Sequence, residues 1–191
     1  MLSYYKDIKL ETSPEVYGPL EDSLLFAEVL EEKISRKKYD RVLEIGCGSG
    51  ILSLIVAKQS SMVSVDINPK SVEITKKNAK LNNLKVDCFV SDMFEKVKGK
   101  FDMIIFNSPY LPDQDNVEGS EMWSDKGVIK RFIRSCKEFL NSDGEVLLLI
   151  SSLSGLERVK KEFKDSGFDV KIIKRQKIAW EELMVLEAKP L

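Results

Sequence analysis

Three closely spaced glycines follow a short apolar run in the first third of the chain. The run over 41–45 leads into Gly46, Gly48 and Gly50, and an apolar, helix-like segment over 51–58 begins directly after them. Glycines at such positions let the backbone come close to a ligand and let the helix pack tightly against the strand. The pattern predicts a strand–turn–helix unit of an α/β fold, with a ligand at the carboxyl end of the strand.

Short apolar runs alternate with helical patterns along most of the chain. Further strands are expected at 62–67, 85–90, 101–107 and 145–151, and helices at 21–35, 69–82, 126–140 and 153–165. This alternation is typical of βαβ units on a parallel sheet. The last two runs, 168–176 and 182–188, have no helix between them, so they predict an antiparallel pair that closes one edge of the sheet.

Length and charge limit the possible classes. The 191 residues favour a single domain, and 30 basic side chains against 31 acidic ones leave a net charge of −1. Because this balance gives no overall field that attracts a polyphosphate, nucleic acid is a less expected partner. The chain shows neither the apolar stretch of a signal peptide nor the ~18 apolar residues of a membrane helix. We therefore expect a cytoplasmic protein with no membrane partner.

The chain has no histidine, and its three cysteines, Cys47, Cys88 and Cys136, are widely spaced. The lack of histidine excludes Ser-His-Asp and Cys-His catalysis and histidine-based metal sites. The cysteine spacing argues against a disulfide framework and a zinc ribbon. We expect the cysteines to be buried as small apolar residues and expect no metal site.

The tetrapeptide Asn107-Ser108-Pro109-Tyr110 follows the apolar run 103–106, where a buried strand would end. An amide or aromatic amino nitrogen is a poor nucleophile because its lone pair is delocalised, so a catalyst has to orient it. The Asn107 side-chain oxygen and the Ser108 carbonyl can each accept one N–H of a planar NH2 group, while the Tyr110 ring stacks on it. These four residues are the candidate catalytic group, and a plain turn after a strand is the alternative.

Acidic residues lie at or just after the ends of the first three predicted strands of the sheet. Glu44 would meet a pyrophosphate unfavourably but can pair with an ammonium group, and the turn has no Lys or Arg for a phosphate. Asp66 stands where a carboxylate can accept the hydroxyls of a ribose. Asp92 can accept from an adenine amino group, with Met93 beside the ring. Helix N-caps are the alternative roles for both aspartates.

Together these residues resemble the cofactor motifs of class I S-adenosylmethionine-dependent methyltransferases, and Asn107-x-Pro109-Tyr110 resembles the motif of their amino-group-methylating branch. The segment 16–23, Val-Tyr-Gly-Pro-Leu-Glu-Asp-Ser, is similar to the cofactor-capping motif of the archaeal and eukaryotic HemK-like glutamine methyltransferases of class 1 release factors. Glu121-Met122-Trp123 with Gly127 and Arg131-Phe132 also resembles that family.

The resemblance implies a Rossmann-like fold whose seven-stranded, mostly parallel sheet has one antiparallel strand and helices on both faces. It also implies S-adenosylmethionine as the cofactor. We expect one domain over 1–191 with an N-terminal helical extension over about 1–38. The methyl acceptor is expected to be the glutamine of a release factor's Gly-Gly-Gln motif. The expected cofactor-binding residues are Tyr17, Ser23, Glu44, Gly46, Cys47, Gly48, Gly50, Asp66, Ile67, Asp92, Met93 and Asn107.

One residue departs from the family pattern, because Ser108 stands where proline is usual. Related adenine dimethylating enzymes tolerate an aliphatic residue there, so an N6-adenine methyltransferase acting on RNA or DNA stays open. The loop 111–124 has four acidic residues and no Lys or Arg, which would repel a phosphate backbone.

A catalytically idle scaffold or binding subunit is an alternative of another class. The usual sheet order of the fold makes 85–90 an edge strand, which can accept a partner strand. The resemblance implies a small zinc-binding activator protein at that edge.

Overall fold

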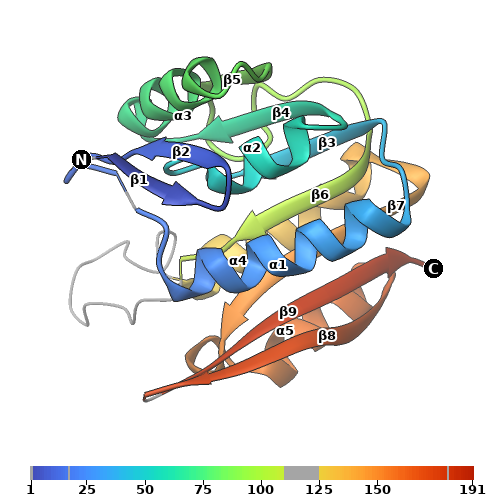
Figure 1. Cartoon of the computed structure of the whole chain (residues 1–191). Helices are drawn as coiled ribbons and strands as arrows, with labels where there is room; N and C mark the ends of the chain where they lie inside the picture. The colour runs from blue at the N-terminus through green and yellow to red at the C-terminus, as the bar shows by residue number, and fades with distance from the viewer. Residues whose placement is uncertain (1, 17, 110–124, 180) are drawn as a thin grey trace.

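The computed structural model describes residues 2–16, 18–109, 125–179 and 181–191. Seven strands form one sheet in the order β5-β4-β3-β6-β7-β9-β8 (Figure 1). They are β3 (Arg41–Ile45), β4 (Ser61–Asp66), β5 (Val86–Val90), β6 (Phe101–Asn107), β7 (Leu140–Ser151), β8 (Phe168–Ile178) and β9 (Glu181–Pro190). Neighbours from β5 to β7 are parallel, whereas β9 is antiparallel to both β7 and β8. The predicted fold class is confirmed, with β5 at one edge.

Helices cover both faces of the sheet. The helices are α1 (Glu21–Arg36), α2 (Ile51–Ala57), α3 (Pro69–Leu81), α4 (Asp125–Cys136) and α5 (Leu156–Asp165). Phe26 of α1 packs in the same core as Val42 of β3, whereas Phe132 of α4 packs in the opposite core with Leu43. Successive residues of a strand point to opposite faces, so a strand buried on both faces reads as a continuous apolar run. This explains why the central strands could be predicted.

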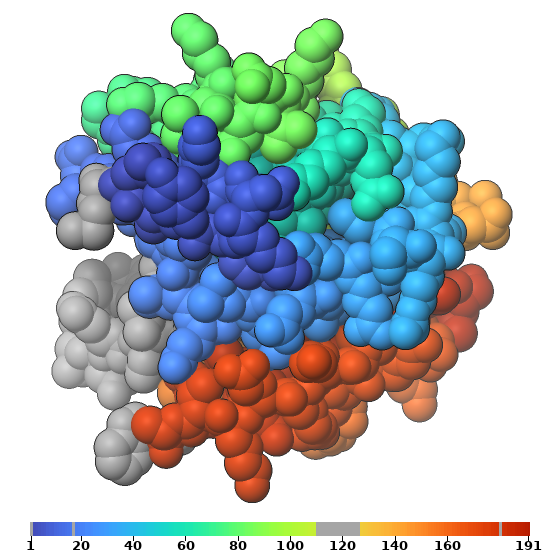
Figure 2. Space-filling view, viewed as in Figure 1, coloured from blue at the N-terminus to red at the C-terminus, as the bar shows by residue number. Residues whose placement is uncertain are grey.

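The first residues form a β-hairpin that the sequence did not predict. Strands β1 (Leu2–Tyr5) and β2 (Ile8–Glu11) pair in a separate two-stranded sheet. Ile8 and Leu10 are buried in the core that also contains residues of α1 and α2. The expected helical extension over about 1–38 therefore needs correction, because it holds a hairpin followed by the single helix α1. On the face in Figure 2, α1 lies between this hairpin and the β8–β9 pair.

Asparagine side chains in α3 and at its C-cap hold the hairpin in place. The Asn78 amide accepts from the Glu11 N–H at 2.8 Å and donates to the Glu11 carbonyl at 3.0 Å. Asn82 makes the same pair of bonds to the backbone of Lys9, at 2.8 and 2.7 Å. Each side-chain amide thus makes the pair of backbone hydrogen bonds with β2 that a neighbouring strand would otherwise make.

Two helix boundaries differ from the prediction. A 3-10 turn over Lys137–Phe139 follows α4, so the helix expected over 126–140 ends at Cys136, and α5 begins at Leu156 after a second such turn. Cys47, Cys88 and Cys136 are buried free thiols, as expected. Among the described residues, none of the helices has the length and apolar character that crossing a membrane requires.

Candidate active site

The carboxyl ends of β3, β4 and β6 open onto a cavity of about 750 Å³, which we call the main cavity. Its volume is within the usual range for small-molecule sites. The predicted site residues that line it are Ser23, Glu44, Gly46, Cys47, Gly48, Asp66, Ile67, Asp92, Met93, Asn107, Ser108 and Pro109. Tyr17 and Tyr110, also predicted, lie outside the described residues. The structure thus brings both predicted groups, cofactor-binding and catalytic, to one place.

The glycine turn has the backbone conformation that its sequence demands. Gly46 and Gly48 have φ of 73° and 50°, values that residues with side chains rarely adopt. The N–H groups of Gly46 and Cys47 donate to the Val65 carbonyl at 2.8 and 3.1 Å. These bonds fix the turn to the end of β4, so its backbone forms one wall of the main cavity.

Gly50 has a packing role. It begins α2 with a φ of 84°, and a Cβ added there would lie 2.9 Å from the Thr75 hydroxyl oxygen of α3. Glycine therefore lets the turn lie close against α3. Gly50 is not among the described residues that line the main cavity, so its expected contact with the cofactor stays a prediction.

Glu44 is buried at the end of β3, with 2% of its surface exposed. It accepts a hydrogen bond from the Ser53 hydroxyl, which also contacts Ser64. Burial above all, together with the nearby Asp66 carboxylate, raises the pKa of Glu44 to about 8, although the hydrogen bond from Ser53 acts in the opposite direction. A cation in the main cavity would favour the ionised carboxylate. Glu44 is therefore suited to meet an ammonium group.

Backbone N–H groups hold the Asp66 carboxylate. Oδ2 accepts from Gly48 at 3.0 Å and Oδ1 from Asn68 at 2.8 Å. A carboxylate has about four acceptor positions, so both oxygens keep capacity for a ligand. Its place at the end of β4, beside the glycine turn, fits the ribose role expected for it.

Asp92 has a basic partner that the sequence analysis missed. Arg131 of α4 donates from Nη2 to Asp92 Oδ2 at 2.7 Å, and both side chains line the main cavity. The Asp92 carboxylate is therefore partly committed, so an adenine amino group would share it with Arg131. The two residues lie 39 positions apart, and no spacing rule connects them; the only signal was the resemblance around Arg131.

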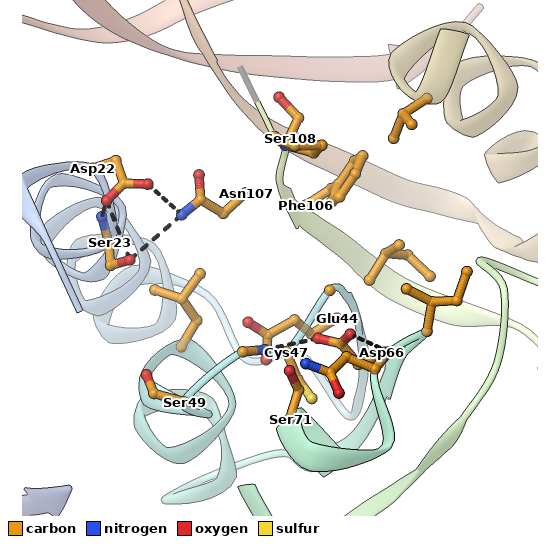
Figure 3. A pocket seen from close by; sticks show the side chains of 18 of the residues that line it. Asp22, Ser23, Glu44, Cys47, Ser49, Asp66, Ser71, Phe106, Asn107 and Ser108 are labelled. Atoms are coloured by element: carbon orange, nitrogen blue, oxygen red, sulfur yellow. Dashed lines mark hydrogen bonds between the residues drawn. The ribbon is translucent and has the colours of Figure 1, made fainter. Parts of the chain in front are cut away.

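The Asn107 side chain is fixed by α1. Its Nδ2 group donates to Asp22 Oδ2 at 2.9 Å and lies 3.4 Å from Ser23 Oγ (Figure 3). Its Oδ1 is buried and meets no hydrogen-bond donor among the described residues. Buried polar atoms normally have partners, so an unpaired acceptor on a residue that lines the main cavity indicates a ligand with a donor. Ser23 was predicted to be near the cofactor, whereas Asp22 was named only within the motif 16–23, without a role or a contact with Asn107.

Ser108 follows Asn107 and is directed toward β7. Its hydroxyl donates to the Leu149 carbonyl at 2.7 Å, and its N–H contacts the same oxygen at 3.3 Å. Proline has neither donor, so the residue that departs from the family pattern makes two bonds that proline could not make. The unusual serine thus anchors the segment that carries Asn107.

The described lining of the main cavity is strongly acidic. Its acidic residues are Glu21, Asp22, Glu44, Asp66, Asp92 and Glu181, and its basic residue is Arg131. Such a lining favours a cationic ligand and opposes a phosphate backbone close to Asn107. The residues also fit a sulfonium cofactor with an amino group, through Glu44, the glycine turn and Asp66.

Comparison with known sequences shows the family to which the chain belongs. Residues 10–177 match the family model described as methyltransferase small domain. The chain is 41% identical over 198 residues to a protein of Methanocaldococcus jannaschii provisionally named protein N5-glutamine methyltransferase, covering 98% of both. It is 28% identical to methyltransferase HEMK2 of Mus musculus, covering 80% of this chain and 79% of the relative. It is also 30% identical to ribosomal RNA small subunit methyltransferase C of Salmonella arizonae, but spans only 43% of that protein.

Two solved structures share the fold. The Mtq2–Trm112 complex of E. cuniculi, described as methylating the translation termination factor eRF1, has a TM-score of 0.71 at 21% identity, covering 93% of this chain and 99% of that one. The 16S rRNA methyltransferase RsmC of T. thermophilus, in complex with AdoMet and guanosine, has a TM-score of 0.71 at 20% identity, covering 100% of this chain and 50% of that one. The chain therefore belongs to the methyltransferase small domain family, and its cofactor is S-adenosylmethionine.

Proposed function

We propose that this protein methylates the side-chain amide nitrogen of a glutamine, and that the glutamine belongs to the Gly-Gly-Gln motif of a class 1 translation release factor. The observation that carries the proposal is that Asn107 lines the main cavity and that its buried Oδ1 meets no hydrogen-bond donor among the described residues. An acceptor at that point suits a primary amide, which has N–H donors to offer.

The chemistry requires orientation more than a strong base. S-adenosylmethionine supplies a methyl group on a sulfonium, so the new N–C bond forms as the C–S bond breaks. Asn107 Oδ1 would accept one N–H of the acceptor amide and the Ser108 carbonyl the other, which turns the nitrogen lone pair toward the methyl carbon. The nitrogen then loses one proton to solvent. Correct positioning of two bound reactants can lower a barrier by ~7–11 kcal/mol.

The remaining lining residues would hold the cofactor. Glu44 would pair with the amino group of its methionine part, Asp66 with the ribose, and Asp92 with the adenine, beside Met93. Tyr17 and Ser23 would cover the cofactor from the N-terminal side. In this proposal one methyltransferase domain spans residues 1–191.

The acidic lining supports a protein substrate. Arg131 is the only basic side chain among the described lining residues, and it is paired with Asp92. The sequence between Pro109 and Ser124 adds Asp113, Asp115, Glu118 and Glu121 and no Lys or Arg. A peptide loop meets no repulsion from these charges, whereas an RNA backbone does. The M. jannaschii relative's name and the eRF1 description of the E. cuniculi complex point the same way.

A nucleic-acid adenine remains the second candidate. It rests on the similarity to ribosomal RNA methyltransferases and on a planar amino group that Asn107 would orient equally well. A catalytically idle scaffold is a third candidate, but it leaves the unpaired acceptor unexplained.

We also propose a small zinc-binding activator protein at the outer edge of β5. This strand pairs only with β4 among the described residues, and Val90 on it is exposed. The related E. cuniculi enzyme is found with a second protein, Trm112. Hydrogen exchange of the chain mixed with such a partner should slow at 86–90; unchanged exchange there would contradict the proposal. Action on a release factor also implies a cytoplasmic location.

The deciding experiment offers the enzyme two substrates at once. Labelled S-adenosylmethionine is added with a release factor and an adenine-containing RNA, followed by mass spectrometry of both. We expect one methyl group on the Gly-Gly-Gln glutamine and none in a release factor whose glutamine is replaced by glutamate. Label found in the RNA alone would overturn the proposal, and label in neither would favour the idle scaffold.

A further inference from the structure

Asp22 lies in the first turn of α1 and is 1% exposed, yet it contacts the candidate catalytic asparagine 85 residues away. Its Oδ1 accepts from the Ser23 N–H at 2.7 Å, which holds the carboxylate in place. Its Oδ2 accepts from Asn107 Nδ2 at 2.9 Å (Figure 3). Asp22 thus lies at the start of a helix, where negative charges are generally favoured.

The identity of this partner decides which way the Asn107 amide faces. The oxygen and nitrogen of a primary amide have nearly the same shape, so only their hydrogen-bond partners distinguish the two orientations. An ionised carboxylate can accept but cannot donate. With Asp22 in place, Nδ2 must face α1, and Oδ1 is left without a partner among the described residues, on a side chain that lines the main cavity.

We propose that Asp22 is a positioning residue: it holds the Asn107 side-chain amide with its oxygen toward the nitrogen that accepts the methyl group. This inference rests on the proposed function for the nature of that nitrogen, but the orientation of Asn107 itself does not depend on it. Hydrogen bonds to an ionised group are stronger than neutral ones, so the carboxylate also makes the amide orientation more rigid. Donation from Nδ2 to a charge further polarises Oδ1 as an acceptor.

The substitution Asp22→Asn tests the inference because it keeps the shape and changes only donors and acceptors. The introduced amide has one acceptor oxygen, which the Ser23 N–H needs, so its NH2 group would face Asn107. Asn107 would then turn its oxygen toward α1 and its NH2 into the main cavity. We expect kcat to fall by about a hundredfold, comparable to the loss of one oriented group in other active sites. We expect the cofactor dissociation constant to stay close to the parent value.

A double variant separates positioning from a merely structural role. When Asp22→Asn is combined with Asn107→Asp, the amide introduced on α1 can donate to one oxygen of the carboxylate introduced on β6, while the other oxygen faces the cavity. We expect this pair to recover part of the lost kcat, whereas Asn107→Asp alone should be poor because two carboxylates would meet. The matched control is Glu28→Gln, which removes a charge from the exposed side of the same helix and should keep the parent kcat.

A spectroscopic measurement needs no methyl acceptor. In the NMR spectrum of the parent, the Asn107 side-chain NH2 protons should show nuclear Overhauser effects to Ser23, and these should vanish in Asp22→Asn. The signal is identified by its loss in Asn107→Asp. If the parent methylates RNA instead of the release factor, the proposed function is wrong. The inference on Asp22 is then tested by comparing the kcat of the parent and of Asp22→Asn with RNA as the substrate. If the Overhauser effects persist in Asp22→Asn, or its kcat equals that of the parent, the inference on Asp22 is wrong.

Discussion

At the scale of single residues, the ionisation of Glu44 makes the stability of the folded protein depend on pH. Burial raises its folded-state pKa from the ordinary 4.5 to about 8. Between these two values the folded protein holds a proton that the unfolded chain releases. The stabilisation from this group is therefore complete below pH ~4.5 and is lost as the pH rises through about 8.

We predict that Glu44→Gln removes this loss. The free energy of unfolding of the cofactor-free parent, measured with urea, should fall more steeply between pH ~5 and ~8 than that of the variant, because glutamine does not ionise. Parallel pH profiles for the two proteins would show that Glu44 is ionised in the folded state at neutral pH.

Ser108 is the second residue whose role can be measured. Its hydroxyl bonds to the Leu149 carbonyl at 2.7 Å, on the side of β7. We predict that Ser108→Ala lowers the free energy of unfolding by about 1 kcal/mol, the usual net value of one hydrogen bond. Urea titration measures this. An unchanged stability together with a lost kcat would mean instead that the hydroxyl acts on the substrate.

At the scale of elements, the hairpin depends on α3. Asn78 is fully buried, and besides its two bonds to Glu11 it donates to the Ser49 carbonyl of the glycine turn at 2.9 Å. One amide therefore joins the hairpin, α3 and the wall of the main cavity. Through Asn78 the hairpin therefore supports the glycine turn, although none of the hairpin's described residues lines the main cavity.

We predict that Asn78→Ala destabilises the protein by at least about 2 kcal/mol, because it leaves buried backbone groups without partners. Hydrogen exchange at 8–11 should become faster in the same variant. Asn82→Ala is the matched control: Asn82 holds the same strand from a more exposed position, so its loss should cost less. Equal effects of the two substitutions would argue against a special role for the buried amide.

At the scale of the whole molecule, sequence alone was enough to predict the sheet. Its central strands are buried on both faces, which gives continuous apolar runs, and β8 and β9 follow each other without a helix. The hairpin could not be predicted, because it has only Ile8 and Leu10 as buried apolar residues and its backbone partners on α3 are far away in the sequence. The same reason explains which residues of the candidate active site could be predicted and which could not. Residues in local motifs, such as Asn107 and Asp66, were found, whereas Asp22 and Arg131 act only through contacts that folding creates.

The charge of the molecule gives a prediction at the same scale. A protein that binds nucleic acid loses affinity steeply as salt rises, because bound counterions are released. With a net charge of −1 and an acidic cavity, this chain should show little salt dependence in KM for a release factor, measured over a series of salt concentrations. A steep rise of KM with salt would contradict this prediction, because it would show that charge attraction contributes strongly to binding of the release factor.

The central claim is that Asn107 catalyses methyl transfer by orienting the acceptor nitrogen. Its most direct test is the single-turnover rate of methyl transfer by Asn107→Ala, measured beside the dissociation constant of S-adenosylmethionine. The account predicts near-parent cofactor binding and a rate lower by about a hundredfold or more. A variant that binds the cofactor and transfers the methyl group at the parent rate would contradict it.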